Sequence, residues 1–426
     1  MKILYLSHRI PYPPNKGDKI RSLNEIKHLS SIHEIDLACL ADDPADLKHE
    51  GDLKEYCKQI CIAPLKPLNA KAKSIVSLAS SRPLSVGYFY SRSLQNIING
   101  WLSSNSYDAV ICFSSPMAEY LFRSPSLESI FSINPGVSRE KRVTSNAQPA
   151  TRNPQLVMDF CDLDSDKWRQ YSLDSAFPLN LIYRIEASLL LRYEKRINRQ
   201  FDHSIFISHQ EADLFLRLYP EAKNVTVIPN GVDYEYFSPT SLSLEPSASD
   251  HNKTPILLFT GAMDYHANVD GVAWFCDEIF SLVKREFSGS RFFIVGSNPT
   301  HKVRALDRRD GVTVTGFVED IRPYYQMADV CVIPLRMARG VQNKVLEAMA
   351  MGKAVVTTTR AAEGIMAVSG EHVLVQDTAK GFINAVSKLV KDQKAGKALG
   401  TRARELVTEK YDWSTNMKKF DTLLQK

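Results

Sequence analysis

One short stretch of the sequence gathers residue types that could hold an anion and a hydroxylated ligand together. Residues 329–359 read DVCVIPLRMARGVQNKVLEAMAMGKAVVTTT. The apolar, β-branched run at its start predicts a strand, and a loop with Arg336, Arg339 and Gly340 follows. Residues 342–351 have helical periodicity and stop at a glycine, a common helix terminator. Strand, basic loop and helix in this order predict a ligand site at the start of the helix.

The predicted helix presents a polar face beside that loop. Asn343, Lys344 and Glu347 fall within roughly 100° of arc, given about 100° per residue. A diphosphate at the helix N-terminus would meet free backbone N–H groups, the positive end of the helix dipole, and Lys344. Glu347 could accept hydrogen bonds from a sugar or ribose hydroxyl pair, and Gly340 lets the backbone approach a ligand closely. The opposite face is apolar and is expected to contact the sheet: Val345, Leu346 and Met349.

An ordinary ion pair between residues i and i+3 on a solvated face is the alternative for Lys344 and Glu347. That alternative leaves Gly340 and the two neighbouring arginines unexplained. We therefore favour a binding site.

The elements that must position this site alternate along the whole chain. Short apolar runs separated by amphipathic stretches predict parallel sheets covered by helices on both faces. Residues 238–254 are polar and rich in Ser and Pro, as in a linker, and residues 134–154 predict an insertion. The chain carries neither G-x-G-x-x-G after a strand nor G-x-x-x-x-G-K-[ST], which argues against a dinucleotide-dependent oxidoreductase or a P-loop NTPase. The predicted strands are 2–7, 34–40, 109–113, 156–160, 204–208, 225–229, 256–260, 291–295, 312–315, 330–334, 354–358 and 372–375.

Composition limits the class of protein. A chain of 426 residues predicts two or three domains, and 44% hydrophobic with 24% charged residues is ordinary for a globular protein. No apolar run reaches the length of a membrane span, and the first residues read as a buried strand rather than a signal peptide, so we expect a cytoplasmic protein. The 7 cysteines lack paired spacing and predict reduced thiols and no metal site.

The charge is uneven along the chain. A net charge of +5 is too small to indicate nucleic-acid binding. Residues 58–107 contain six Lys or Arg and no Asp or Glu. A solvated helical face is one explanation, and a surface for anionic phospholipid or a phosphorylated lipid is the other.

Three segments together resemble a known family. They are VTVIPNGVDYEYFSP (225–239), FTGAMDYHANVDGVAWFCDEIF (259–280) and QNKVLEAMAMGKAVVTT (342–358). The chain resembles the retaining glycosyltransferases of family 4, which have the GT-B fold, over almost its whole length. It is most similar to sugar transferases of bacterial exopolysaccharide clusters associated with PEP-CTERM/exosortase systems.

The resemblance implies roles for single residues. Glu347 matches the second glutamate of the family's E-x7-E motif, which binds the donor ribose, and the backbone around Val341 and Gln342 would hold the diphosphate. The loop 13–21 matches a turn near the reaction centre and makes Gly17, Asp18, Lys19 and Arg21 candidate acceptor-side residues. The remaining implied donor contacts are Gly261, Gly296, Gly316, Phe317, Val318, Arg336, Gly340, Asn343 and Lys344.

The sequence departs from the family pattern at the first E-x7-E position, which is Arg339. The family's Arg and Lys after the first C-terminal strand fall on Ala262 and roughly on Asn268. Arg336, Arg339 and Lys344 are additional cations, so positive charge is relocated, while the contact to the donor sugar's own hydroxyls stays unassigned.

Two N-terminal groups are further candidates. The segment DFCDLDSDKW (159–168) follows a predicted strand, and Asp162 in it could belong to an acceptor or sugar pocket. A helix N-terminus capped by Ser165 is the alternative. His8 ends the first strand and could reach a cleft, although a lone His is often structural. We predict Arg339, Lys344, His8 and Asp162 as the catalytic group.

The predicted architecture is two doubly wound, Rossmann-like domains facing each other across a cleft. Residues 1–238 form the acceptor side, 239–254 the linker, 255–401 the nucleotide-sugar domain, and 402–426 a helix returning to the first domain. The predicted reaction is sugar transfer from a nucleoside diphosphate sugar to a saccharide or lipid-linked acceptor, with no metal or other cofactor. Two alternatives stay open: a nucleotide-sugar 2-epimerase of the same fold, and a non-catalytic sugar-nucleotide-binding partner.

Overall fold

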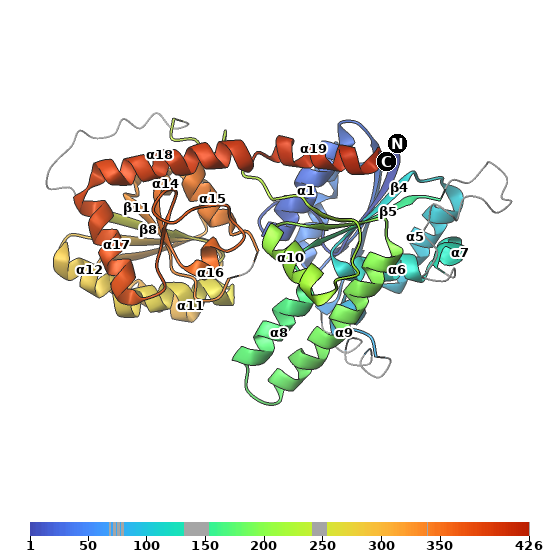
Figure 1. The fold of residues 1–426 in the computed structure, drawn as a ribbon, viewed down its shortest axis with the longest axis horizontal. Helices are drawn as coiled ribbons and strands as arrows, with labels where there is room; N and C mark the ends of the chain where they lie inside the picture. Colours follow the sequence, from blue (N-terminus) through green and yellow to red (C-terminus); the bar gives the residue numbers. More distant parts are fainter. Residues whose placement is uncertain are drawn as a thin grey trace. The chain divides into compact units, whose positions relative to one another are not determined.

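The computed structural model describes residues 1–67, 70, 74, 77, 81–131, 153–240, 254–338 and 340–425. The chain divides into two compact units (Figure 1). The first unit is Met1–Ile228 with Met417–Lys426, and the second is Pro229–Asn416. Most of the predicted linker, and the predicted insertion at 134–154 except its last two residues, lie outside the described residues.

The first unit is built on a parallel seven-stranded sheet with the order β3-β2-β1-β4-β5-β6-β7. Residues of β1 pair in register with β2 on one side and β4 on the other, as Tyr5 does with Leu37 and Ile111. The chain therefore reverses its direction of winding between β1 and β4. The strands are β1 (Lys2–Ser7), β2 (Glu34–Ala41), β3 (Gln59–Pro64), β4 (Ala109–Phe113), β5 (Gln155–Cys161), β6 (His203–Phe206) and β7 (Val225–Val227).

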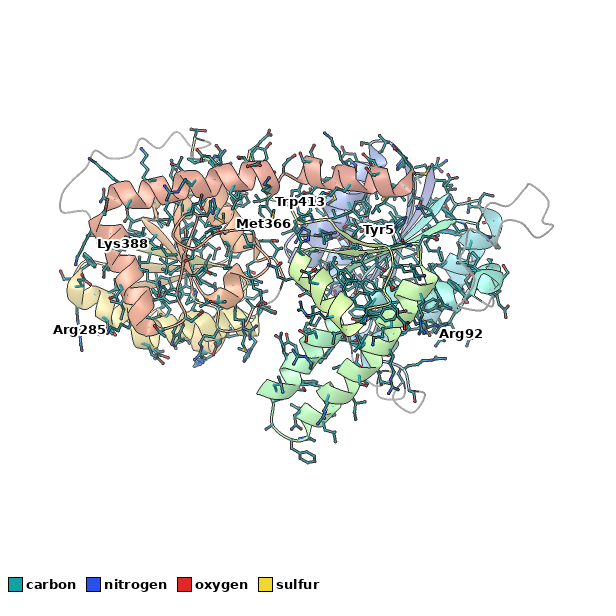
Figure 2. The ribbon with its side chains drawn as sticks, viewed as in Figure 1. Tyr5, Arg92, Arg285, Met366, Lys388 and Trp413 are labelled. Carbon is teal, nitrogen blue, oxygen red and sulfur yellow. The ribbon has the colours of Figure 1, made fainter. Side chains whose placement is uncertain are left out.

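Helices cover this sheet because its strands are apolar on both faces. The side chains of Ile3, Leu4, Tyr5 and Leu6 in β1 are all 0% exposed, and Tyr5 lies inside the unit in Figure 2. The helices are α1 (Gly17–Ser30), α2 (Glu50–Leu53), α4 (Leu84–Tyr88), α5 (Arg92–Ser104), α6 (Ala118–Phe122), α7 (Glu128–Phe131), α8 (Asp164–Asp174), α9 (Leu179–Gln200) and α10 (His209–Leu218). The 3-10 turns are η1 (Pro44–His49), η2 (Ser115–Met117) and η3 (Pro125–Leu127).

The second unit has a parallel six-stranded sheet with the order β10-β9-β8-β11-β12-β13. Its winding reverses between β8 and β11, which is where open α/β sheets bind ligands. The strands are β8 (Ile256–Thr260), β9 (Arg291–Val295), β10 (Val312–Gly316), β11 (Val330–Ile333), β12 (Ala354–Thr357) and β13 (Leu374–Val375). The helices are α11 (His266–Trp274), the π-helix η5 (Phe275–Phe280), α12 (Ser281–Glu286), α13 (His301–Leu306), α14 (Arg322–Met327), α15 (Asn343–Ala350), α16 (Thr359–Ala362), α17 (Ala379–Lys391) and α18 (Gln393–Lys410).

The predicted helix 402–426 is divided: α18 ends at Lys410, and the last helix, α19 (Trp413–Leu424), follows. Within the first unit its end is fixed by two contacts. Asp421 Oδ1 lies 2.9 Å from His28 Nε2 of α1, and the Leu423 carbonyl accepts a 2.9 Å bond from the Gln155 side chain of β5.

The predicted fold class, two Rossmann-like parallel sheets, is confirmed. One strand was not predicted: β3 lies inside the acid-free segment 58–107, which we had interpreted through its charge alone.

Candidate functional site

Helix α15 begins directly after a turn that only a residue without a side chain adopts easily. Gly340 has a φ of +58°, in the left-handed region. Gln342 is the residue before the helix, and no side chain caps the helix there among the described residues. The apolar face is anchored as predicted, since Val345 and Leu346 are both 0% exposed. Within the described part of the chain the start of α15 therefore has no side-chain cap, which leaves its N-terminus to an anion.

The Lys344 ammonium is held at the end of strand β8. Its Nζ lies 2.5 Å from Asn268 Oδ1 of α11 and 4.8 Å from the centre of the Phe259 ring. The Asn268 amide in turn donates a 2.8 Å bond to the Ala262 carbonyl. Burial lowers the pKa of Lys344 to about 8, against the opposing effect of the Glu347 charge. Asn268, at a position where the resemblance implies a cation, thus binds a cation supplied by α15.

Glu347 belongs to a short hydrogen-bonded chain that leads back to β8. Its Oε2 accepts a 3.0 Å bond from the Tyr325 hydroxyl of α14. That hydroxyl also lies 2.9 Å from Thr260 Oγ1. Burial raises the pKa of Glu347, while the Tyr325 bond and the Lys344 charge act in the opposite direction. Glu347 and Lys344 are therefore oriented by separate neighbours at the same edge of the sheet.

Two glycines let the ends of β8 and β9 approach backbone to backbone. A Cβ on Gly296 would lie 1.7 Å from the Gly261 carbonyl oxygen, a distance no real side chain tolerates. A Cβ on Gly261 would lie 2.7 Å from Asn268 Nδ2 and 3.0 Å from Lys344 Nζ. Both glycines have φ values near +150°, at the border of the region that other residues avoid. Larger residues at either position would displace the Lys344 ammonium or separate the strands.

The end of β10 carries the remaining predicted donor contacts. Gly316 has a φ of +73° and open space beside it. The Phe317 side chain is 78% exposed, and Val318 is partly buried. An exposed ring on a strand end is available for stacking on a planar ligand.

Arg336 is held by a carboxylate of α11. Its Nε donates to Asp270 Oδ2 at 3.0 Å, and its Nη2 donates to Asp270 Oδ1 at 2.5 Å. The guanidinium carbon lies 5.7 Å from the centre of the Trp274 ring. This two-point pair with α11 offsets its positive charge. Arg339, predicted as catalytic, lies outside the described residues.

Two further predicted donor contacts, Asn343 and Val341, lie beside the loop. The Asn343 Oδ1 is buried and has no hydrogen-bond partner among the described residues. Val341 is 8% exposed, so only its backbone can contribute.

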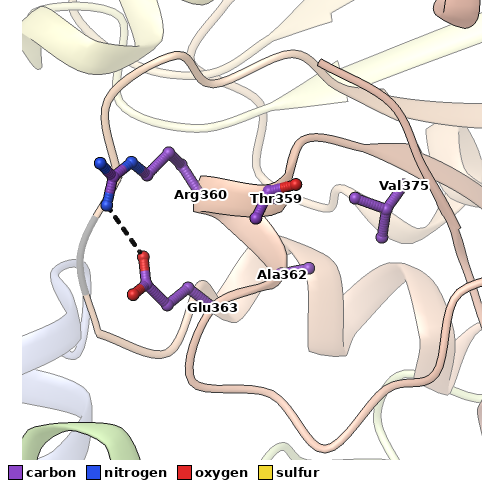
Figure 3. A pocket seen from close by; sticks show the side chains of 5 residues that line it. All are labelled: Thr359, Arg360, Ala362, Glu363 and Val375. Carbon is purple, nitrogen blue, oxygen red and sulfur yellow. Dashed lines mark hydrogen bonds and ion pairs between the residues drawn. The ribbon is translucent and has the colours of Figure 1, made fainter.

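A cavity of about 330 Å³ lies past the end of β12 (Figure 3). Arg360 and Glu363 of its wall form an ion pair of 3.4 Å. A Cβ on Gly364, directly after Glu363, would lie 3.2 Å from the Gly340 carbonyl. The cavity therefore borders the turn that starts α15. Its lining residues are Thr359, Arg360, Ala362, Glu363 and Val375.

In the first unit, His8 lies where the winding reverses. Its ring stacks on Phe113 at the end of β4, with centroids 5.9 Å apart, and meets Phe89 edge-on at 5.2 Å. Its Nε2 is 3.3 Å from Asp18, which also pairs with Arg9 at 2.7 Å. Burial alone would raise the pKa of Asp18, but the bonds to His8 and Arg9 hold it well below its usual range. His8 Nδ1 is buried without a hydrogen-bond partner among the described residues.

The predicted loop 13–21 is corrected in its second half. Helix α1 begins at Gly17, and the side chains of Lys19 and Arg21 turn into the unit, where they are 2% and 1% exposed. Lys19 pairs with Asp46 at 2.6 Å, and Arg21 pairs with Asp159 at 2.5 Å and Glu25 at 2.9 Å. Both cations are occupied by buried carboxylates, so neither is available to an acceptor.

Asp162 lies just before α8. The N-terminus of this helix is satisfied by other residues than the predicted cap. Ser165 is not the cap. Instead its N–H donates 3.0 Å to Glu194 of α9, and the Leu163 N–H donates 2.7 Å to Glu211 of α10. Burial raises the pKa of Glu194 to about 8. Carboxylates supplied by other helices thus satisfy the start of α8.

Among the described residues, no group of three or more His, Cys, Asp or Glu side chains could hold a metal ion. Likewise, no described helix is long and apolar enough to cross a membrane.

Comparison with known proteins is consistent with this geometry. Residues 254–392 match the family model described as glycosyl transferases group 1, and residues 177–236 match the model of glycosyltransferase family 4. The chain is 23% identical over 422 residues to an uncharacterized 44.6 kDa protein in the cps region of Klebsiella pneumoniae, covering 96% of each.

Solved structures share the fold. Sucrose-phosphate synthase from Thermosynechococcus elongatus superposes with a TM-score of 0.68 at 18% identity, over 100% of this chain and 98% of that one. Anabaena HepE in complex with UDP superposes with a TM-score of 0.62 at 14% identity, over 100% of both chains. The same protein in complex with UDP-glucose superposes with a TM-score of 0.61 at 15% identity, over 100% of this chain and 99% of that one.

The group 1 match lies within the second unit and contains the whole α15 site, and the family 4 match begins in the first unit and ends shortly after Pro229. The chain is thus a glycosyltransferase with the GT-B fold, similar to group 1 over residues 254–392 and to family 4 over residues 177–236.

Proposed function

We propose that the chain transfers a sugar from a nucleoside diphosphate sugar to a saccharide or lipid-linked acceptor, with retention, in bacterial exopolysaccharide biosynthesis. The observation that carries the donor assignment is the joint position of Lys344 and Glu347 beside the uncapped start of α15. HepE, of the same fold, is solved with UDP and with UDP-glucose, which supports a UDP-sugar as the first donor to try.

In this proposal the diphosphate lies at the N-terminus of α15, where backbone N–H groups and the Lys344 ammonium stabilise the charge that develops as the sugar leaves. Glu347 accepts hydrogen bonds from a hydroxyl pair of the donor, and Phe317 stacks on the base. The side chain of Asn343 contributes its unpartnered carbonyl oxygen to the donor. Positioning and charge stabilisation then supply most of the catalysis.

His8 is the candidate acceptor-side group, because it lies at the reversal point of the first sheet and has a buried nitrogen to spare. Gly17 and Asp18 start α1 beside it. Asp162 and Arg339 remain proposed catalytic residues to which we assign no step.

The relative in the cps region supports surface polysaccharide assembly as the setting. The finer link to PEP-CTERM/exosortase systems rests on the sequence resemblance alone. We further propose that the enzyme meets a lipid-linked acceptor at an anionic membrane surface. Within the segment 58–107, the other surface considered for this contact, Lys58 pairs with Glu34 at 2.6 Å, and both Phe89 and Tyr90 pack against the core. Lys71 and Lys73 lie outside the described residues.

The test incubates the protein with radiolabelled UDP-sugars, with and without a membrane extract as acceptor. Label moving into a saccharide or lipid product only when acceptor is present supports the proposal. Conversion of the donor sugar without any acceptor would identify an epimerase instead. Donor binding without turnover under either condition would identify a non-catalytic partner.

A further inference from the structure

Helices α8 and α9 form an antiparallel hairpin that extends from the first unit (Figure 1). The connection between them spans residues 175–178. Four large, exposed apolar side chains surround this connection, and we call them the apolar tip. They are Leu173 (72% exposed), Phe177 (78%), Leu179 (50%) and Leu181 (51%). Side chains stand out from the free end of the hairpin in Figure 2. Clustered apolar exposure of this kind marks an interaction surface.

Behind the apolar tip lies an aromatic layer. The Trp168 ring is 5.1 Å from Tyr183 and 5.8 Å from Tyr171, and the two tyrosine rings are 6.2 Å apart. Tyr171 is 38% exposed. Aromatic side chains with a polar edge favour the boundary between water and lipid.

Two arginines share the level of this layer. Arg169 lies five residues before the end of α8 and Arg184 five residues after the start of α9. At about 1.5 Å per residue, each is about 7.5 Å back from its helix end. That distance matches the depth of about 5–10 Å to which interfacial elements bury their apolar face. Both arginines are exposed. Arg169 also pairs with Asp166 at 2.5 Å, which offsets its charge, so the electrostatic argument rests on Arg184.

Three acids of the hairpin are turned inward. Glu186 and Glu194 are 0% exposed and Asp166 is 3% exposed. Glu186 accepts bonds from the Leu84 and Ser85 N–H groups at the start of α4, at 2.5 and 2.9 Å. The outward charge of α9 is therefore mainly positive.

The positive surface continues along α9 away from the tip. A second cavity of about 330 Å³ is lined by four arginines and by Glu119. The arginines are Arg82, Arg123, Arg192 and Arg196. An anionic surface is electrostatically complementary to this face. A second copy of the chain is disfavoured, because two tips in symmetric contact would bring their Arg184 side chains together.

We propose that the α8–α9 hairpin docks this protein on an anionic phospholipid surface, with the apolar tip in the acyl boundary and Arg184 at the phosphates. The docking deepens the membrane contact proposed above and needs neither donor nor acceptor to occur.

The experiment measures co-sedimentation of the full chain with vesicles of neutral phosphatidylcholine, or of phosphatidylcholine with about a third of phosphatidylglycerol. The wild type is expected to bind the anionic vesicles and to be released by salt. The double variant Phe177→Ser with Leu179→Ser should lower the partition coefficient by about tenfold or more, because each side chain contributes on that scale when buried. The matched control is Ile32→Ser, since Ile32 is 53% exposed on the same unit but lies outside the hairpin.

A second pair of variants isolates the charge. Arg184→Glu should weaken binding to anionic vesicles, whereas Arg199→Glu should not, because Arg199 is an exposed arginine of the same helix about 22 Å farther from the tip. Melting temperatures of all variants should match the wild type, since every altered side chain is exposed.

Four results would overturn the docking proposal: no vesicle binding, binding indifferent to lipid charge, equal losses in the control variants, or tip variants that change the oligomeric state in solution instead of the partition coefficient. The vesicles contain no sugar donor or acceptor, so these outcomes are independent of whether glycosyl transfer is observed.

Discussion

At the scale of single residues, Glu347 is the side chain whose removal discriminates best between a binding role and a structural one. Glu347→Ala should raise the donor KM or abolish donor binding, because a charged hydrogen bond to a hydroxyl pair contributes about 1.5–3 kcal/mol. That range corresponds to a loss of donor affinity of roughly ten- to hundredfold. Isothermal titration with UDP-sugar measures it.

The control for this prediction is Glu371→Ala, another glutamate of the second unit, whose side chain is 57% exposed. It should leave donor affinity unchanged. Wild-type affinity in the Glu347 variant would refute its assignment.

Lys344 predicts a pH dependence of binding. Its pKa is lowered to about 8 by burial, so the ammonium is charged below that pH and neutral above it. Affinity for UDP should therefore be highest near pH 7 and fall as the pH rises through 8 towards 8.5. The diphosphate itself is fully ionised over this range, because its last pKa is about 6.

The matched variant is Lys344→Arg, whose guanidinium stays charged throughout and should flatten the profile. Uridine without phosphates should show no such fall in the wild type. A decline of the same size for uridine would contradict a role in phosphate binding.

At the scale of elements, the hairpin base holds a buried carboxyl group that couples stability to pH. The pKa of Glu194 is raised to about 8 by burial, above the value of about 4.5 expected when unfolded. A raised pKa means that the folded protein binds the proton more tightly. The stability that Glu194 contributes is thus fully present below about pH 4.5 and is lost as the pH rises towards 8.

Glu194→Gln keeps an oxygen for the Ser165 N–H and removes the charge, so it should raise the melting temperature at pH 8.5 and have less effect at pH 5.5. Each kcal/mol gained shifts the transition by about 2–4 °C in a unit of this size. Differential scanning fluorimetry at both pH values measures the difference. An equal rise of the melting temperature at both pH values would mean that the Glu194 carboxyl group is ionised at pH 5.5 as well as at pH 8.5.

The elements also show what the sequence could predict. Strands 2–7, 109–113, 256–260 and 291–295 agree with the structure to the residue, because each is an apolar, β-branched run between clear turn signals. Strand β3 was missed, since its residues QICIAP are short and only partly buried at the edge of the sheet.

The site was predictable only where its residues are close in sequence. Lys344 and Glu347 share one helix, and periodicity alone puts them on one face. Their partners Asn268 and Tyr325 are 76 and 22 positions away, and Asp270 is 66 from Arg336. Such contacts depend on how the strands are ordered, and no local pattern signals them.

At the scale of the whole molecule, donor binding should stabilise the folded chain. A ligand at 100 times its dissociation constant adds about 2.7 kcal/mol to the free energy of unfolding. A thermal-shift screen across nucleoside diphosphates and their sugars should give the largest shift for the base that the site selects, and the Glu347→Ala variant should lose it. Equal shifts for all bases, retained in that variant, would indicate general anion binding.

The exposed end of the α8–α9 hairpin has a kinetic consequence. A protein held at a bilayer by that end searches for a lipid-carried acceptor by lateral diffusion in two dimensions, and its encounter rate follows the acceptor's mole fraction in the lipid rather than its concentration in the volume. Adding acceptor-free lipid to the same vesicles would then slow turnover at constant enzyme and acceptor, a surface dilution that a protein acting from solution would not show.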